Sequence, residues 1–237
     1  MSRTGIDAAA AAMRGGDERM DYHARRAHRI ALVGLAFRKR LAMSSPRSIP
    51  PARPLPRVHG ISARGEGDRI VEEVDLEFGN GERRRYRRVC ARGPGSVMVA
   101  AMADADTILL VREYACGTGR YEIGLPKGRM DDGESPEQAA NRELKEEAGF
   151  GARRLTRLRS LALSPAYMEF TTHLVLAQDL YPERLAGDEP EEIEVLPWKL
   201  DDLHALMLRE DCSEGRSLAA LFIVRELLAR RANGEMA

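Results

Sequence analysis

The stretch that most limits how this chain can fold is RELKEEAGF, residues 142–150, which places three glutamates in one helix-forming segment. Glu143, Glu146 and Glu147 lie one, three or four positions apart, so a helix brings their carboxylates close together on its surface. Like charges at helical spacings destabilise an isolated helix by roughly 0.2 to 0.5 kcal/mol per pair. A helix that keeps all three glutamates therefore needs a compensating positive charge.

Both ends of this helix are marked in the sequence. Ser135 suits the N-cap, Pro136 suits the first helical position, and Gln138 completes a capping-box pattern. Gly149 is a natural left-handed C-terminal stop. The apolar positions fall on one stripe, formed by Ala140, Leu144 and Ala148. The helix therefore buries that stripe and presents its glutamates together at its side, where a hard cation such as Mg²⁺ finds the oxygen ligands that it prefers.

The residues upstream of the helix extend this pattern. The spacing G-x5-E-x7-R-E-U-x-E-E-x-G-U, with U apolar, is matched by Gly128, Glu134, Arg142, Glu143, Leu144, Glu146, Glu147, Gly149 and Phe150. Its seven polar or glycine positions arise by chance on the order of 10⁻⁵ or less in a chain of this length. On this pattern the chain resembles the Nudix hydrolases, from which it departs slightly because Phe150 stands where an aliphatic residue is usual.

The resemblance implies a metal-dependent enzyme that hydrolyses a nucleoside diphosphate linked to another group, using Mg²⁺ or Mn²⁺. The metal ligands that it implies are Glu143, Glu146, Glu147 and the carbonyl of Gly128. Arg142 would hold one of the carboxylates in place, and Glu134 would support the loop or an outer-shell water. Cleavage of a pyrophosphate requires charge neutralisation on the phosphoryl oxygens and an activated water, both of which clustered metal ions supply.

The rest of the chain reads as an α/β protein. Strands are predicted over 69–78, 82–90, 96–102, 107–114, 158–164, 172–180 and 194–200, and further helices over 201–210 and 217–231. A Gly-Asn-Gly turn joins the first two strands as a hairpin. Because GxGxxG and long crossovers are missing, we expect an α/β/α sandwich with a mixed sheet, as the Nudix resemblance implies, and not a doubly wound sheet.

The front of the chain differs in composition from the rest. Residues 1–60 hold 12 Arg or Lys against 4 Asp or Glu, and residues 44–60 contain five prolines and no acidic residue. We interpret 1–60 as a mobile extension or a mis-called start, and 61–237 as the Nudix domain with an N-terminal β segment. The apolar run 30–37 is far short of the ~20 residues that span a bilayer, so no membrane partner is expected.

Charge and cysteine content exclude other classes. The formal net charge is zero, and only four of the 37 basic residues are lysines, so we predict no nucleic-acid partner. The three cysteines lack CxxC spacing, so neither a disulfide framework nor a zinc site is indicated, and a cytoplasmic location is expected.

The segments 111–128, 163–167 and 177–195 are similar to the ADP-ribose pyrophosphatase branch of the family, and most to its bacterial ADP compounds hydrolases. Pro165 matches a proline that marks this branch. The resemblance implies ADP-ribose, NADH and short diadenosine polyphosphates as substrates, cleaved to AMP and a phosphorylated remainder. It also implies a homodimer in which an N-terminal β segment, residues 69–90 here, packs against the partner.

The general base is less marked. In this branch it often comes from a mobile acidic loop, and residues 187–194, GDEPEEIE, are the equivalent segment here, called the acidic loop below. Glu189 is the preferred candidate and Glu191 the next, with direct action of Glu147 as the alternative. An ordinary solvated loop explains the same residues without a function.

Three charged residues before the glutamates are candidates for substrate binding: Arg112, Arg120 and Glu122. An arginine there can grip a diphosphate with two parallel hydrogen bonds, although surface charges at a strand edge would look the same. Two other functions stay open. One is a hydrolase of diadenosine polyphosphates or nucleotide sugars, and the other is a Nudix-fold sensor that binds such ligands without cleaving them.

Overall fold

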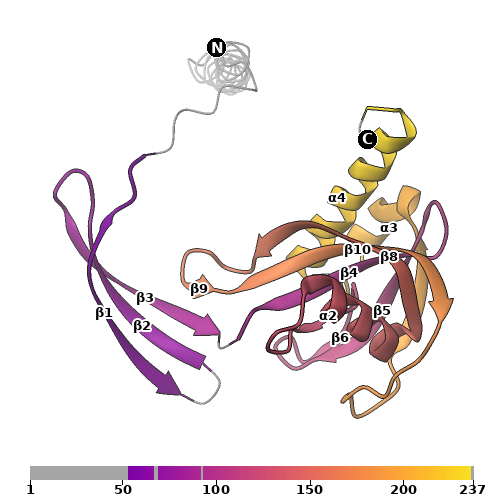
Figure 1. Ribbon diagram of the computed structural model, residues 1–237, viewed down its shortest axis with the longest axis horizontal. Helices are drawn as coiled ribbons and strands as arrows, with labels where there is room; N and C mark the ends of the chain where they lie inside the picture. The colour runs from indigo at the N-terminus through magenta and orange to yellow at the C-terminus, as the bar shows by residue number, and fades with distance from the viewer. Residues whose placement is uncertain (1–52, 67–68, 92, 236–237) are drawn as a thin grey trace, which may run out of the picture. The chain divides into compact units, whose positions relative to one another are not determined.

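The computed structural model describes residues 53–66, 69–91 and 93–235 (Figure 1). By its contacts the chain divides into two units, residues 1–54 and 55–237, and all the helices and strands below belong to the second. Most of the predicted extension 1–60 lies outside the described residues, so the proposed domain division stays a prediction.

A seven-stranded mixed sheet is the centre of the second unit. Its main path runs β11-β5-β4-β10-β8, with β6 paired to β5 and β7 paired to β4. The pairing of β4 with β10 is parallel, and the other pairings are antiparallel. The strands are β4 (Ser96–Met102), β5 (Thr107–Ala115), β6 (Arg120–Gly124), β7 (Lys127–Arg129), β8 (Phe150–Ala162), β10 (Thr171–Pro182) and β11 (Glu194–Lys199).

Helices cover both faces of this sheet. The elements are α2 (Pro136–Glu143), the π-helical turn η1 (Leu144–Ala148), the 3₁₀ turn η2 (Leu200–Asp202), α3 (Leu203–Met207) and α4 (Gly215–Ala232). Every residue of β4 is buried, and its side chains alternate between two apolar clusters. Met98 and Ala100 pack with α3 and α4, whereas Val97 and Val99 pack with α2 and η1. This arrangement confirms the predicted α/β/α sandwich, and each fully buried large apolar side chain contributes about 1.5 to 3 kcal/mol to it.

The helix that carries the glutamates, α2 with η1 (residues 136–148), is called the glutamate helix from here on. Its N-terminus has the predicted capping box, in which Gln138 N donates to Ser135 Oγ at 3.2 Å and Ser135 N donates to Gln138 Oε1 at 2.9 Å. Gly149 ends it in the left-handed region, at φ 75°. The sequence predicts one regular helix, but the last turn is π-helical from Leu144 onward. Such widened turns occur frequently at functional sites.

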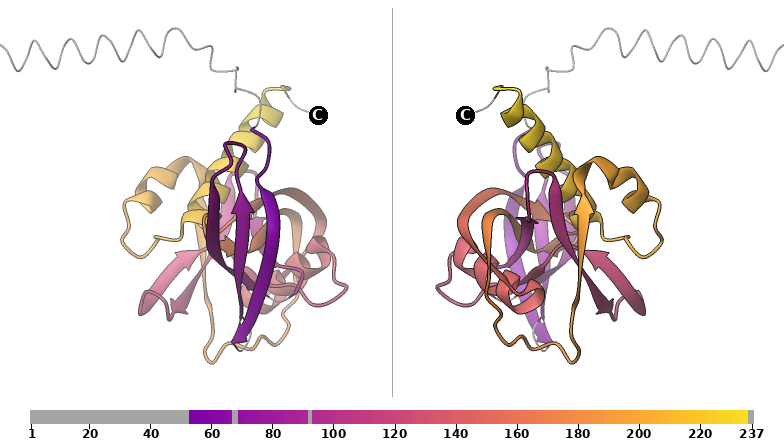
Figure 2. Two further views of the ribbon diagram at one scale, coloured as in Figure 1. Left: turned by 90° about the vertical axis from the view of Figure 1, so that its left-hand side faces the viewer. Right: turned by 90° about the vertical axis from the view of Figure 1, so that its right-hand side faces the viewer.

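A smaller sheet precedes the sandwich, in the order β1-β2-β3-β9, and is called the N-terminal sheet below. Its strands are β1 (Arg57–Glu66), β2 (Arg69–Glu77), β3 (Arg83–Ala91) and β9 (Met168–Glu169). The predicted hairpin is confirmed as β2 and β3, which run antiparallel beside β1 in the left view of Figure 2. Across it, acidic residues of β2 face arginines of β3, as in the pair Asp75–Arg85 at 2.7 Å. Such exposed pairs favour one register but add little stability.

Two strands begin earlier than the sequence pattern indicates. Strand β1 begins at Arg57, at the end of the Pro-rich segment 44–60, because its pairing with β2 is a tertiary contact that the local pattern does not show. Strand β8 begins at Phe150 instead of 158, since arginines on its exposed face mask the alternation.

The C-terminal helices are also placed differently from expectation. The helix predicted over 201–210 is shortened to Leu203–Met207, preceded by η2. The last helix, α4, is found close to its predicted place. Among the residues that the structure describes, no helix is long and apolar enough to cross a membrane.

Candidate active site

Arg142 joins the glutamate helix to the segment before it. Its Nε and Nη2 atoms donate to the two carboxylate oxygens of Glu134, at 3.1 and 3.0 Å. Its Nη1 donates to Glu143 at 2.7 Å and to Glu146 at 3.0 Å, and Nη2 also donates to the carbonyl of Arg129 at 2.8 Å. One guanidinium therefore supplies the compensating charge for two of the crowded glutamates and orients both, extending the predicted role of Arg142.

The carboxylates of Glu143 and Glu147 are buried, with 7% and 2% of each residue exposed. Burial raises the pKa of Glu147 to about 8, although the nearby charge of Lys127 and a 3.1 Å hydrogen bond from the Lys127 N–H oppose the rise. Burial also raises the pKa of Glu143, against the effect of Arg142. These carboxylates are short of positive charge, which is the condition that a bound cation relieves.

Gly128 lies on β7 directly against Glu143. A Cβ atom built on Gly128 would lie 2.1 Å from the carboxyl carbon and from both carboxylate oxygens of Glu143. Only glycine leaves room for this approach. The family resemblance implies that the carbonyl of Gly128 is a metal ligand. The structure adds a second reason for glycine at this position, a steric one, which the sequence does not show. An all-oxygen donor set beside a glycine cradle fits a hard divalent cation such as Mg²⁺ or Mn²⁺.

Lys127 and Glu113 belong to this site, and the sequence analysis did not select them. The Lys127 ammonium donates to Glu113 at 2.9 Å, while the Lys127 backbone N–H binds Glu147. Burial alone would lower the pKa of Lys127, but Glu113 and Glu147 raise it overall, so the ammonium stays charged. The available signal was the position of Lys127 directly before the glycine of the motif.

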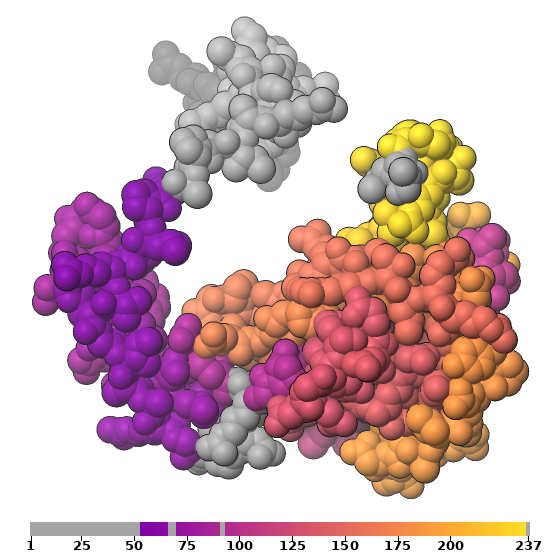
Figure 3. Space-filling view, in the orientation of Figure 1, coloured from indigo at the N-terminus to yellow at the C-terminus, as the bar shows by residue number. Residues whose placement is uncertain are grey.

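The acidic loop lies against the glutamate helix. Leu185 N, just before the loop, donates to the carbonyl of Lys145 at 3.2 Å. A Cβ atom at Gly187 would lie 2.3 Å from a carboxylate oxygen of Glu189 and 3.6 Å from Cβ of Glu146. In Figure 3 this segment, in orange, borders the rose-coloured surface of the helix. Glu189 is thus placed near the glutamates, and its charge is one of the influences that raise the pKa of Glu143.

Glu191, the second candidate base, is held elsewhere. Its Oε1 accepts a hydrogen bond of 2.5 Å from the hydroxyl of Tyr121 on β6. The two candidates of the loop therefore have different surroundings, although their sequence context is the same.

The three predicted substrate contacts, Arg112, Arg120 and Glu122, are all bound to other groups of the protein. Arg112 pairs with Glu194 at 2.8 Å, and Arg120 pairs with Glu122 at 2.8 Å. Glu122 also accepts hydrogen bonds from the N–H and hydroxyl of Ser213, at 3.0 and 2.9 Å. Within the described residues, the Nε atom of Arg112 is buried without a hydrogen-bond partner. Substrate binding by this group stays a prediction, since its contacts are those of a structural ion-pair network.

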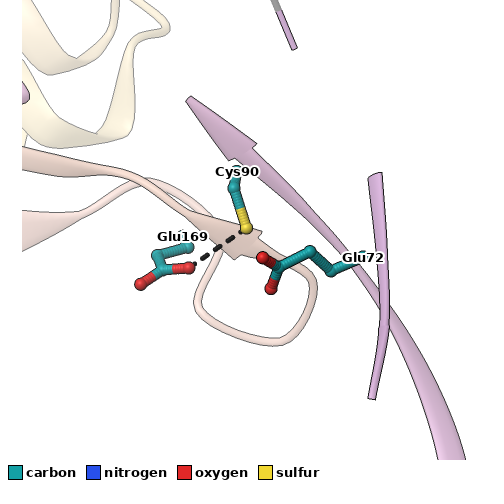
Figure 4. A group of neighbouring side chains, drawn as sticks. All are labelled: Glu72, Cys90 and Glu169. Carbon is teal, nitrogen blue, oxygen red and sulfur yellow. Dashed lines mark hydrogen bonds between the residues drawn. The ribbon is translucent and has the colours of Figure 1, made fainter. Parts of the chain in front are cut away.

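A second cluster of possible ligand atoms lies in the N-terminal sheet. Glu72, Cys90 and Glu169 keep one ligand atom each within 4.8 Å of one another, and the Cys90 thiol donates to Glu169 at 3.1 Å (Figure 4). Arg88 binds Glu72 at 2.7 Å and lies 3.3 Å from Glu169. Burial raises the pKa of Cys90 to about 12, so the thiol is protonated at neutral pH. Arg88 supplies a positive charge shared by the two carboxylates, and the cluster joins β9 to β2 and β3.

Comparison with known proteins places this geometry in context. A NUDIX domain model matches residues 93–222, and a model of the NudE-type Nudix hydrolase N-terminal domain matches residues 56–88. The chain is 50% identical over 158 residues to the ADP compounds hydrolase NudE of Escherichia coli, covering 67% of this chain and 84% of that protein. It is 31% identical over 156 residues to the ADP-ribose pyrophosphatase of Bacillus subtilis, covering 65% and 82%. A crystal structure of an ADP compounds hydrolase matches with a TM-score of 0.68 and 43% identity, over 79% of this chain and all of that one.

The cradle at Gly128 can be tested by filling it. In Gly128→Ala the new methyl group must displace the Glu143 carboxylate, so we expect Mn²⁺ affinity, measured by calorimetry, to fall by about 10- to 100-fold. The matched control is Gly117→Ala, where a Cβ meets no atom within 4 Å. Unchanged Mn²⁺ binding in Gly128→Ala would show that the close approach is not needed.

The raised pKa of Glu147 predicts how stability depends on pH in the metal-free protein. A carboxyl whose pKa in the folded state exceeds its ordinary value of 4.5 destabilises the fold as pH rises from there through about 8. In EDTA at pH 8.5 we expect the free energy of unfolding of Glu147→Gln, measured by urea titration, to exceed that of the parent by on the order of 1 to 3 kcal/mol. At pH 5 we expect the two free energies to be nearly equal. Glu192→Gln, on an exposed loop residue, is the control. A loss of stability in Glu147→Gln at both pH values would contradict this account.

Proposed function

Because the chain belongs to the Nudix hydrolase family, we propose that it is a metal-dependent pyrophosphohydrolase of ADP-linked compounds. The proposed substrates are ADP-ribose, NADH and short diadenosine polyphosphates, which it cleaves to AMP and a phosphorylated remainder. The names of its relatives, an ADP compounds hydrolase and an ADP-ribose pyrophosphatase, support an ADP-linked substrate.

The observation that carries this proposal is the complete set of charged groups on the glutamate helix. Glu143, Glu146 and Glu147 are all present; Arg142 binds the first two, and Gly128 lies against Glu143. A protein that only sensed its ligand would not need all three carboxylates. The intact set therefore favours catalysis over binding alone.

In the proposed mechanism each residue has a separate task. Glu143, Glu146 and Glu147 would hold the divalent cation, for which we propose Mg²⁺, and the Gly128 carbonyl would add a ligand. The cation, when bound, would neutralise charge on the diphosphate and lower the pKa of the attacking water. Arg142 orients two of the carboxylates through one nitrogen, and Glu134 anchors that guanidinium from the other side. This anchoring keeps the donor oxygens in place between turnovers.

We assign proton transfer to Glu189. Its loop lies against the glutamate helix, and its side chain lies near Glu146. A carboxylate in this position can accept a proton from the attacking water once the substrate is bound. Glu191 is less suited to this task because its carboxylate is bound to Tyr121. Glu147 is also less suited, since the N–H of Lys127 occupies one of its oxygens.

The proposed activity is tested by incubating the protein with ADP-ribose and Mg²⁺ and following release of AMP. We expect turnover by the parent, and a kcat at least about 100-fold lower in Glu146→Gln and in Glu189→Gln, with Glu192→Gln as control. A side-by-side panel with NADH and diadenosine polyphosphates ranks the substrates by kcat/KM. Tight binding without turnover of any of these compounds would show that the protein is a sensor.

We also propose that the protein is a homodimer that uses the open face of the N-terminal sheet. A groove of about 580 Å³ opens there, between the sheet and the segment from Ala162 to Thr171. Large apolar side chains line it although they are exposed: Val58 by 52%, Ile61 by 54%, Tyr86 by 47% and Tyr167 by 55%. Contiguous exposed apolar surface of this kind is typical of a protein contact. A second copy would cover it.

The dimer is tested by light scattering coupled to gel filtration. We expect the mass of a dimer for the parent and of a monomer for Ile61→Glu, because a contact that covers these apolar side chains would strip water from the new carboxylate. Ser62→Lys, an exposed position on the same strand whose side chain points to the opposite face, is the control. A parent of monomeric mass at micromolar concentration would remove this proposal.

A further inference from the structure

The contact between Tyr121 and Glu191 joins two segments that are 70 residues apart in the sequence. Tyr121 lies on β6 and is 48% exposed, and its hydroxyl donates to Glu191 at 2.5 Å. Its ring meets that of Tyr114, its partner on β5, edge to face with centroids 5.6 Å apart. Edge-to-face packing restrains the ring, so the hydroxyl is offered in a defined direction.

The acidic loop is attached at both ends as well. On one side, Leu185 N is bound to the carbonyl of Lys145, at the glutamate helix. On the other side, Ile193 is buried and Glu194 starts β11, where it pairs with Arg112. Between these ends the chain is largely exposed. The hydroxyl of Tyr121 is thus placed to hold the middle of the loop.

Charge alone would drive this loop away from the helix. Four of its residues before Ile193 are acidic, namely Asp188, Glu189, Glu191 and Glu192. They lie next to a helix with three glutamates, with Glu189 and Glu146 both beside Gly187, and like charges at such short range repel. A neutral hydroxyl holds one of the loop carboxylates without adding a positive charge that would compete for the metal ligands. Some such attachment is needed for the loop to stay close.

The backbone between Glu191 and Glu189 transmits this attachment. Pro190 separates the two residues; its ring holds its own φ near −65° and restricts Glu189, the residue before it. Holding Glu191 therefore also limits where the Glu189 side chain can point. That side chain lies toward Glu146.

We propose that Tyr121 is a positioning residue that holds the acidic loop through Glu191 and thereby keeps Glu189 facing the glutamate helix. The catalytic part of this inference rests on the proposed function, in which Glu189 accepts the proton. In this proposal Glu191 attaches the loop, whereas the sequence alone made it the second candidate for the general base. Tyr121 itself touches no reacting atom.

The first test measures the loop in the metal-free protein and needs no activity. Hydrogen–deuterium exchange of the Leu185 amide, which is bound to the carbonyl of Lys145 and holds the start of this segment on the helix, should rise severalfold in Tyr121→Phe and in Glu191→Ala. Tyr114→Phe is the matched control, because it keeps the ring pair and removes a hydroxyl for which the described structure shows no hydrogen bond. The thermal midpoint should stay the same in all three, since these side chains are exposed. Unchanged exchange in Tyr121→Phe would overturn the proposal.

The second test measures kinetics with ADP-ribose and Mg²⁺. Tyr121→Phe and Glu191→Ala should each lower kcat about fivefold with KM within about twofold, and the double variant should be no slower than the slower single one. Tyr114→Phe should match the parent. Losses that multiply in the double variant would overturn the proposal, as would a loss in Glu191→Ala of 100-fold or more, which would make Glu191 the base.

The two tests separate this proposal from the proposed function. If the parent hydrolyses none of the candidate substrates, the proposed function fails. The exchange measurement then still decides whether Tyr121 holds the loop, with raised exchange supporting the attachment and unchanged exchange overturning it.

Discussion

The guanidinium of Arg142 is the group on which the rest of the site depends. It binds Glu134 through two nitrogens and, through the third, both Glu143 and Glu146. Removing the arginine would leave Glu143 buried and unpaired, a change that costs several kcal/mol when a buried ion pair is broken from one side. The same contacts hold two donor oxygens at one side of the helix. Positive charge for two of the glutamates and the orientation of both carboxylates thus come from one side chain.

The sandwich supplies what the helix cannot. Strand β4 buries side chains on both faces, so the glutamate helix is packed against the sheet and its glutamates cannot turn to solvent. Strand β7, paired to β4, then brings Gly128 against Glu143, and Lys127 places its N–H on Glu147. Burial raises the pKa values of Glu143 and Glu147, so a bound cation would stabilise their charged forms. These buried carboxylates lower the stability of the metal-free protein, and the proposed function requires them.

The acidic loop and the N-terminal sheet hold their carboxylates in different ways. The acidic loop brings more negative charge to a site that is already negative, and neutral or backbone groups attach it: the hydroxyl of Tyr121 and the N–H of Leu185. In the N-terminal sheet, by contrast, acidic residues are paired with arginines, as Glu72 is with Arg88. At the glutamate helix, one guanidinium is shared among Glu134, Glu143 and Glu146.

The sequence by itself determined the features that depend on near neighbours. The capping box at Ser135, the stop at Gly149 and the spacing of the three glutamates follow from helix geometry over a few residues, and the short apolar run 96–102 predicts a buried strand. With the motif, they were enough for the family and the fold class. The sequence did not show the π-helical turn at Leu144 or the strand at Arg57, because these depend on packing and pairing beyond the local pattern.

Tertiary structure decided which charged groups meet. Glu189 and Glu191 read alike in sequence, yet one lies near Glu146 and the other is bound by Tyr121, 70 residues away. Arg112 is likewise bound to Glu194, an ion pair between two strands that no local spacing predicts. A pattern in sequence specifies which residues share a face of one element. Only the packing of different elements sets the distances between faces, and at this site those distances determine burial, charge and the position of the proposed base.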